Sequence, residues 1–253
     1  MNIKDSKYFK GKNKWLVNTP QEGDGLQLLK DLKDEVVQLV IFDPQYEDVK
    51  KVTVGGGISD SKIRKVFFHP SPIKEQTEMD IKEFCKEIFR VLKPNGWMML
   101  WMNENILIKG RYKEWLEGLA LKIKRILVWS KRNPLRASII FNSNEYCLLI
   151  KKHPYEMNYR RKNKMISNTF FESIHNCKRV HLHTKPYKMN KKIIKLITNK
   201  GDLVVDPCAG GFVSLLVCDK LKRDFIGTDL TLREIMQFNI NKENSRELLK
   251  KEK

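Results

Sequence analysis

The sequence predicts a single α/β domain with a doubly wound, mostly parallel sheet. Strand-like and helix-like patterns alternate along most of the chain, without repeats or a low-complexity linker. Two short apolar runs, residues 36–42 and 202–205, each end in an acidic residue and a turn, which is typical of buried strands in such sheets. With 253 residues, the chain can bury roughly 70–75% of its unfolded surface in one core, so one domain is enough.

Local patterns justify the elements in chain order. Helices are expected at residues 24–32, 80–92, 111–121, 190–197 and 213–221, and strands at 36–42, 97–101, 123–129, 145–150 and 202–205. Pro94-Asn95-Gly96 ends the second helix and precedes a buried strand. A Gly-rich turn joins the strand at residues 202–205 to the helix at 213–221, an arrangement that offers backbone room and N–H donors to a nucleotide-like ligand.

One long segment, residues 47–77, has no clear periodicity. It contains Gly55-Gly56-Gly57 and two prolines, which are typical of a loop. Two interpretations stay open for it, a solvated excursion and a flap that closes over substrate beside Asp43.

Composition excludes several classes of protein. The five cysteines are scattered without a Cys-x-x-Cys pair, the amino terminus has no signal-peptide pattern, and no apolar run approaches the roughly 20 residues of a membrane helix. His175, Cys177, His181 and His183 crowd together, but their spacing matches no closed tetrahedral site. We therefore expect a cytoplasmic, reduced protein that binds neither a metal nor a membrane.

The charge of the chain indicates a polyanionic partner. Lys and Arg number 49 against 30 Asp and Glu, which leaves a net charge of +19. Residues 151–195 hold 13 Lys or Arg and two Glu, with tyrosines and phenylalanines between them, and phosphate contact and base stacking need these two kinds of side chain. The run Arg160, Arg161, Lys162 and Lys164 is interpreted as a phosphate-contacting stretch of a small basic insert, with a solvated loop as the alternative.

Several motifs occur together in a known order. They are Asp43-Pro44-Gln45-Tyr46, residues 90–96, Asn144-Glu145-Tyr146, Lys185-Pro186 and Asp206-Pro207-Cys208-Ala209-Gly210-Gly211. Over about residues 13–240, the chain resembles the amino-methylating DNA methyltransferases of the beta arrangement, which modify adenine N6 or cytosine N4. The resemblance implies a Rossmann-like S-adenosylmethionine-dependent methyltransferase fold.

The same resemblance implies an organisation of the chain. It is a single methyltransferase domain over residues 1–253, with a catalytic half at about 13–150, a target-recognition insert at about 151–180 and a cofactor-binding half at about 181–240. The expected partners are double-stranded DNA, a second copy of the chain or a cognate restriction endonuclease. The strand before Asp43 is expected to lie beside the strand before Asp206, at the switch point where such sheets bind ligands.

Roles for the cofactor half also follow from the resemblance. S-adenosylmethionine is expected over residues Asp206, Pro207, Cys208, Ala209, Gly210 and Gly211. Lys185 and Pro186 are expected near its methionine end. Asp229, at the end of the next strand, is expected to accept hydrogen bonds from the ribose hydroxyls, because a diol offers two donors. The alternative for Asp229 is a turn or cap residue.

The chemistry of an exocyclic amine gives the tetrapeptide Asp43-Pro44-Gln45-Tyr46 a catalytic role. The lone pair of the amine is delocalised into the base until two acceptors draw its hydrogens. The carboxylate of Asp43 and the backbone carbonyl of Pro44 are suitable acceptors, and Tyr46 can stack on the extruded base. The alternative is a turn whose aspartate only caps a helix.

Two positions depart from the family pattern. Gln45 replaces the usual second proline, and Phe212 stands where the cofactor loop often has a glycine. These departures leave open an inactive, nucleic-acid-binding subunit. The leading expectation is a DNA adenine-N6 methyltransferase, and the alternatives are cytosine-N4 methylation and RNA methylation, which use the same amine chemistry.

Overall fold

The computed structural model of the chain describes residues 7–11, 13–45, 76–131, 142–156, 166–173 and 185–230. Within them one sheet runs in the order β5-β3-β4-β2-β1-β6-β7. The strands are β1 Val37–Phe42, β2 Leu92–Met102, β3 Leu121–Ser130, β4 Asn144–Lys152, β5 Thr169–Phe171, β6 Leu203–Asp206 and β7 Asp224–Gly227. The pairs β1–β2, β1–β6, β6–β7 and β3–β5 are parallel, whereas β4 is antiparallel to β2 and β3. The predicted mostly parallel sheet is confirmed.

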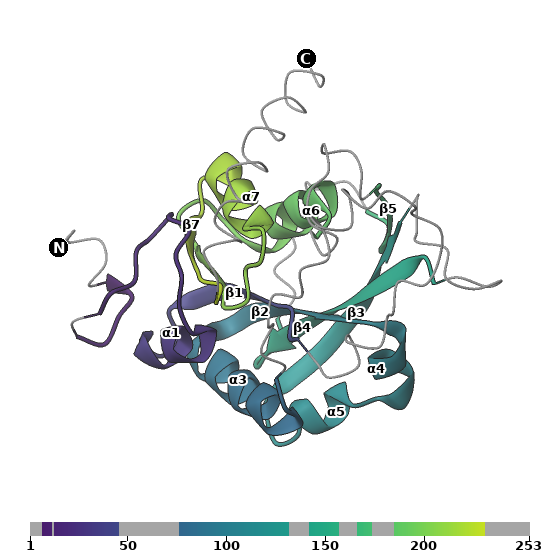
Figure 1. Ribbon diagram of the computed structural model, residues 1–253, viewed down its shortest axis with the longest axis horizontal. Coiled ribbons are helices and arrows are strands. Elements are labelled where there is room, and N and C mark those ends of the chain that lie inside the picture. The colour runs from purple at the N-terminus through teal and green to yellow at the C-terminus, as the bar shows by residue number, and fades with distance from the viewer. Residues whose placement is uncertain are drawn as a thin grey trace, which may run out of the picture.

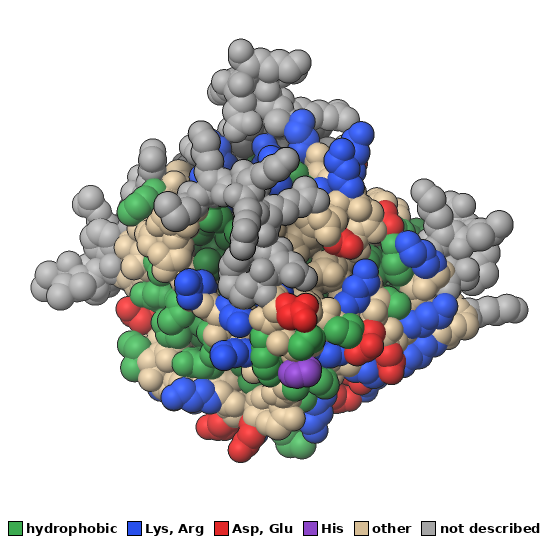
Figure 2. Space-filling view, turned by 180° about the vertical axis from the view of Figure 1, so that it is seen from behind, with side chains coloured by type: hydrophobic (Ala, Val, Ile, Leu, Met, Phe, Trp, Pro, Cys, Tyr) green, Lys and Arg blue, Asp and Glu red, His purple; other side chains and the backbone are tan. Residues whose placement is uncertain are grey.

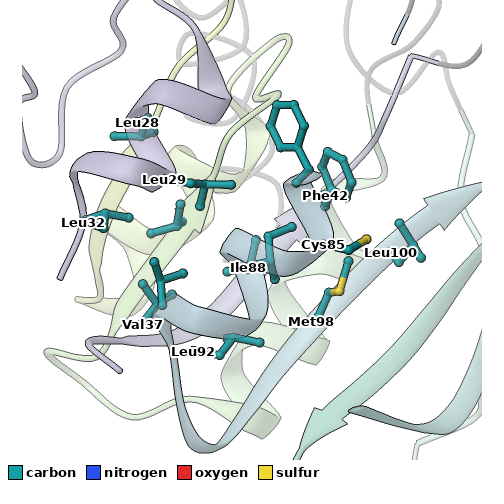
Figure 3. Close-up of a cluster of buried hydrophobic side chains, with 14 of the residues drawn as sticks. Leu28, Leu29, Leu32, Val37, Phe42, Cys85, Ile88, Leu92, Met98 and Leu100 are labelled. Atoms are coloured by element: carbon teal, nitrogen blue, oxygen red, sulfur yellow. The ribbon is translucent and has the colours of Figure 1, made fainter. Parts of the chain in front are cut away.

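Helices cover both faces of this sheet (Figure 1). They are α1 Gly25–Asp31, α3 Glu78–Val91, α4 Glu104–Lys109, α5 Tyr112–Trp115, α6 Tyr187–Ile197 and α7 Val213–Leu221. One buried cluster joins α1, α3, α4 and α5 to the sheet, and a second joins α6 and α7 to the opposite face. Figure 3 shows part of the first cluster, in which Phe42 of β1 stacks on Phe84 of α3 with ring centroids 5.0 Å apart.

The two parallel crossovers explain why the sheet is doubly wound. The chain passes from β1 through α3 to β2 in one direction, and from β6 through α7 to β7 in the other. Because parallel crossovers are right-handed, opposite directions place the two helices on opposite faces, as their membership of the two clusters confirms. The boundary between β1 and β6 is therefore the switch point of the sheet.

Local signals set the ends of the helices. Thr77 caps α3 in a capping box with Asp80, and the side chain of Asp24 caps α1. The predicted helix at residues 111–121 is wrong. Only the single turn of α5 forms. It ends at its cap Leu116, and the chain then passes through Gly118, which adopts φ +72°, into β3. The short elements α4 and β5 were not predicted.

No helix among the described residues is long and apolar enough to cross a membrane.

Candidate active site

The ends of β1 and β6 bring the two acidic motifs together. Leu39 pairs with Val204 and Val40 with Val205, both in parallel register. Asp43 and the loop that starts at Asp206 therefore leave the sheet at the same edge, although more than 150 residues separate them. The family resemblance implied this adjacency of the two strands, and the switch point is where doubly wound sheets bind ligands.

Asp43 lies beside the ammonium group of Lys185. The distance from Asp43 Oδ2 to Lys185 Nζ is 2.9 Å, and the side chain of Asp43 is 22% exposed. Burial raises the pKa of Asp43, while the Lys185 cation acts in the opposite direction. Lys185 Nζ also lies 4.9 Å from the centroid of the Trp101 ring, a cation–π contact. The structure thus places Lys185 against the carboxylate of the tetrapeptide.

Glu145 holds Lys185 from its other side. Its Oε2 accepts a hydrogen bond from Lys185 Nζ at 3.0 Å, and its Oε1 pairs closely with Lys131. Burial alone would raise the pKa of Glu145, but Lys185 and Lys131 bring it down to about 2. Glu145 is therefore an anion at neutral pH that orients the cation beside Asp43.

Asp206 is a buried acid with one oxygen paired. Its side chain is 5% exposed, and its Oδ2 accepts a hydrogen bond of 2.5 Å from Ser214 Oγ. Its Oδ1 is buried and has no hydrogen-bond partner among the described residues. Burial raises the pKa of Asp206 to about 7, against the effect of the Ser214 hydrogen bond. An unpaired buried oxygen of this kind is suited to a cationic or hydrogen-bond-donating ligand.

The turn after Asp206 is tied to the end of β7. The Gly210 N–H donates to Asp229 Oδ2 at 2.9 Å, and the Ala209 N–H donates to the Thr228 carbonyl at 3.0 Å. Gly210 adopts φ +47°, and a Cβ built there would meet no atom within 4 Å. Asp229 therefore orders the turn, and the open space above Gly210 leaves its backbone accessible to a ligand.

Phe212 occupies the position of this turn where related sequences often have a glycine. It adopts φ 52°, a conformation that favours glycine, and its side chain is fully buried in the cluster under α7. Packing of the ring offsets the backbone strain.

The amino-terminal segment supports the same turn from behind. A Cβ at Gly25 would lie 2.0 Å from the Pro207 carbonyl oxygen, so only glycine fits where α1 meets the turn. The Gly23 N–H donates to the Asp229 carbonyl at 2.9 Å. Residues far apart in sequence thus brace one loop.

Comparison with known proteins agrees with this geometry. A family described as DNA methylase, N6_N4_Mtase, matches residues 37–239. The chain belongs to this family. It is 32% identical over 217 residues to the Type II methyltransferase M.HhaII of Haemophilus parahaemolyticus, which covers 85% of this chain and 91% of that protein. It is 27% identical to the Type II methyltransferase M2.DpnII of Streptococcus pneumoniae, over 88% of each chain.

Solved structures of DNA methyltransferases share the fold of this N6/N4 methylase. The PvuII DNA methyltransferase, which is cytosine-N4-specific, superposes with a TM-score of 0.64 at 16% identity, over 88% of this chain and 85% of that one. The M1.HpyAVI–SAM complex superposes with a TM-score of 0.62 at 19% identity, over 89% and 98%. The expected Rossmann-like methyltransferase fold is confirmed.

Several residues of the methylase site were missed by sequence reasoning. Glu145 belongs to a motif that we noted without a role, although a lone acid at the start of an apolar strand is a usable signal. Lys131, Trp101 and Ser214 were not assigned roles, because each contributes through a tertiary contact that its local pattern does not report.

Other predicted residues lie outside the described part of the methylase. These are Tyr46, Arg160, Arg161, Lys162, Lys164, His175, Cys177, His181 and His183, together with the segment 47–75. Among the residues that the structure does describe, no group of three or more His, Cys, Asp or Glu side chains could hold a metal ion.

Proposed function

We propose that this DNA methylase is an S-adenosylmethionine-dependent adenine-N6 methyltransferase that acts on a base flipped out of duplex DNA. The observation that carries the proposal is the meeting of Asp43 and the 206–211 turn at the β1–β6 switch point. A methyl donor and an amine acceptor must be held next to each other, and the switch point offers one position for each.

The turn between β6 and α7 is suited to S-adenosylmethionine. When bound, this cofactor supplies an electrophilic methyl group on a sulfonium. The unpaired Oδ1 of Asp206 and the open backbone at Gly210 fit a ligand that carries positive charge and a nucleoside. Pro207, Cys208, Ala209 and Gly211 complete the turn, and Asp229 at the end of β7 is proposed to accept hydrogen bonds from the ribose.

The tetrapeptide is suited to activate an amine. In this proposal the carboxylate of Asp43 and the carbonyl of Pro44 accept the two amine hydrogens, and Tyr46 stacks on the base. Asp43 must be ionised to accept, and the Lys185 ammonium at 2.9 Å favours that state. In this proposal Lys185 keeps the Asp43 carboxylate ionised, and Pro186 follows it as the cap of α6.

DNA is proposed to be held by the basic insert. Arg160, Arg161, Lys162 and Lys164 would neutralise phosphates, because contacts of this kind supply most sequence-independent affinity. The division into a catalytic half, a recognition insert and a cofactor half belongs to the same proposal.

Cytosine-N4 methylation is the second candidate, because Asp43 and Pro44 would accept the hydrogens of either amine. Direct calling of modified bases separates the two. The chain is expressed in a host that lacks DNA methyltransferases, and the genomic DNA is sequenced with adenine-N6 and cytosine-N4 methylation scored in every context. We expect N6-methyladenine at one short sequence. N4-methylcytosine at such a site would establish the second candidate.

Absence of both marks would overturn a DNA methyltransferase. RNA methylation and an inactive subunit are then separated by two further measurements. Methyl incorporation into total RNA reports the first. A rise in the thermal midpoint with S-adenosylmethionine shows that the cofactor binds the folded chain, and its absence points to the second.

A further inference from the structure

Gln76 makes two hydrogen bonds to the residue that replaces a proline in the tetrapeptide. The Gln45 N–H donates to Gln76 Oε1 at 3.0 Å. The Gln76 backbone N–H donates to the Gln45 carbonyl at 2.7 Å. The first bond requires a residue with an N–H at position 45, and a proline there would have none.

The position of Gln76 is itself fixed. It directly precedes Thr77, the cap of α3, whose N–H and hydroxyl both contact Asp80 at 2.9 Å. α3 packs on the sheet through buried residues that include Ile81 and Phe84. The amide of Gln76 therefore extends from a rigid helix start and not from a free loop.

The bond to Gln45 N–H determines where the Pro44 carbonyl points. Both groups belong to the same peptide unit, which is planar and trans, so they point in opposite directions. Holding the N–H toward Gln76 turns the Pro44 carbonyl away from it. Among the described residues this carbonyl accepts no hydrogen bond. Donation by the N–H also polarises the peptide and makes its carbonyl a better acceptor.

The same side chain reaches the cofactor turn. Gln76 Nε2 lies 3.8 Å from Cys208 Sγ, a weak hydrogen bond to sulfur. One amide therefore contacts the element proposed to hold the amine and the element proposed to hold the methyl donor.

We propose that Gln76 is a positioning residue for methyl transfer, which aims the Pro44 carbonyl through the Gln45 N–H and thereby compensates for the missing second proline. This inference rests on the proposed function, in which the Pro44 carbonyl accepts an amine hydrogen. Gln76 acts through Gln45 and does not touch the reacting atoms.

A double-mutant cycle tests this role. The proteins are the wild type, Gln76→Met, Gln45→Pro and the double variant. Methionine keeps the length of the side chain without its polar atoms. The measurement is single-turnover methyl transfer to an unmethylated duplex that contains the sequence found to be modified in cells. The rate constant and the amplitude are recorded separately. Gln27→Met, at an exposed position of α1 where the amide bonds Asp31 at 2.8 Å, is the matched control.

In the Gln45 background we expect Gln76→Met to lower the rate constant about five- to tenfold, which corresponds to one lost hydrogen bond and a less well aimed acceptor. The amplitude and the thermal midpoint should match those of Gln27→Met. In the Gln45→Pro background, the same Gln76 substitution should change the rate constant by less than about twofold, because no N–H remains for Gln76 to hold. Any part of the effect that passes through Cys208 would appear in S-adenosylmethionine affinity.

Three outcomes would overturn the inference. The first is a Gln76→Met rate constant equal to that of Gln27→Met. The second is an equal loss in both backgrounds, and the third is a loss confined to the amplitude, which marks a folding role. In each of these cases wild-type methyl transfer persists, so the proposed function stands. If the wild type transfers no methyl group, the proposed function fails and this inference falls with it.

Discussion

Asp43 is the residue on which the proposed chemistry depends most directly. It accepts a hydrogen of the target amine in this scheme, and in the structure its carboxylate pairs with Lys185. Asp43→Ala should therefore lower the methyl-transfer rate constant at least tenfold, since a hydrogen bond to a charged group is worth about 1.5–3 kcal/mol. S-adenosylmethionine affinity, measured by calorimetry, should change little. Turnover within about tenfold of wild type would remove Asp43 from the mechanism.

Lys185 sets the pH range in which Asp43 is an acceptor. Burial raises the pKa of Asp43 and the Lys185 cation lowers it, so loss of the cation should raise that pKa further. The rate then falls at a higher pH as the medium is acidified, because the protonated carboxyl no longer accepts the amine hydrogen. In Lys185→Met we expect the acid limb of the pH–rate profile to move to higher pH, because the cation that lowers the pKa of Asp43 is gone.

Lys185→Arg is the matched control, because it keeps the charge beside Glu145. Its acid limb should stay near that of the wild type. If all three proteins share one midpoint while Lys185→Met binds S-adenosylmethionine more weakly, Lys185 serves the cofactor, as the family resemblance first suggested.

At the scale of the element, the turn between β6 and α7 is shaped by glycine. Gly210 in this turn adopts φ +47°. Gly201, which lies before β6, adopts φ +77°, and a Cβ at either position would meet no atom within 4 Å. Leucine at either site carries a similar backbone strain of about 1–2 kcal/mol. Only Gly210, however, lies where the cofactor is proposed to bind.

Gly210→Leu should therefore lose S-adenosylmethionine binding, while Gly201→Leu should keep it. Thermal unfolding of the two variants should give similar midpoints, which separates strain from occlusion of the site. Wild-type affinity in a folded Gly210→Leu protein would move the cofactor elsewhere.

The elements also show what local pattern can and cannot predict. The strands before Asp43 and Asp206 were predictable because each is an apolar run that ends in an acid. Residues 111–121 were wrongly predicted as one helix. Their periodicity is helical, but α5 ends at its cap Leu116, and Gly118 two residues later adopts a left-handed conformation. Periodicity reports which face is apolar, but it does not report the backbone conformation of one glycine.

Local patterns marked Glu145 and Lys185 as motif residues, but they did not predict that the two side chains form one charge network. Lys185 and Glu145 meet across 40 positions of sequence. Their contact depends on the antiparallel register of β4 against β2, in which Tyr146 pairs with Met102. Gln76 could not be predicted as a site residue from local pattern, because it lies at the end of a segment without periodicity. Residues that act through tertiary contacts become visible only once the sheet is assembled.

For the whole molecule, positive charge is the dominant property. Figure 2 shows Lys and Arg side chains spread over the visible face together with Asp and Glu. Besides the basic insert at residues 160–164, α6 carries a group of lysines. Lys188, Lys191, Lys192 and Lys195 follow the spacing of one helix face. Net charge alone therefore does not identify the surface that contacts DNA.

The salt dependence of binding identifies it. Conversion of Arg160, Arg161, Lys162 and Lys164 together to Gln removes four candidate phosphate contacts and keeps the side chains polar. Duplex affinity should fall, and the slope of log affinity against log salt should flatten by up to about 3.6 units, at roughly 0.9 per contact. S-adenosylmethionine affinity should stay the same, because Asp206 and its turn belong to another element.

The matched control converts the four lysines of α6 to Gln, which changes the net charge equally and should leave the slope unchanged. If the α6 variant flattens the slope and the insert variant does not, the polyanion is held by α6, and residues 160–164 form a solvated loop.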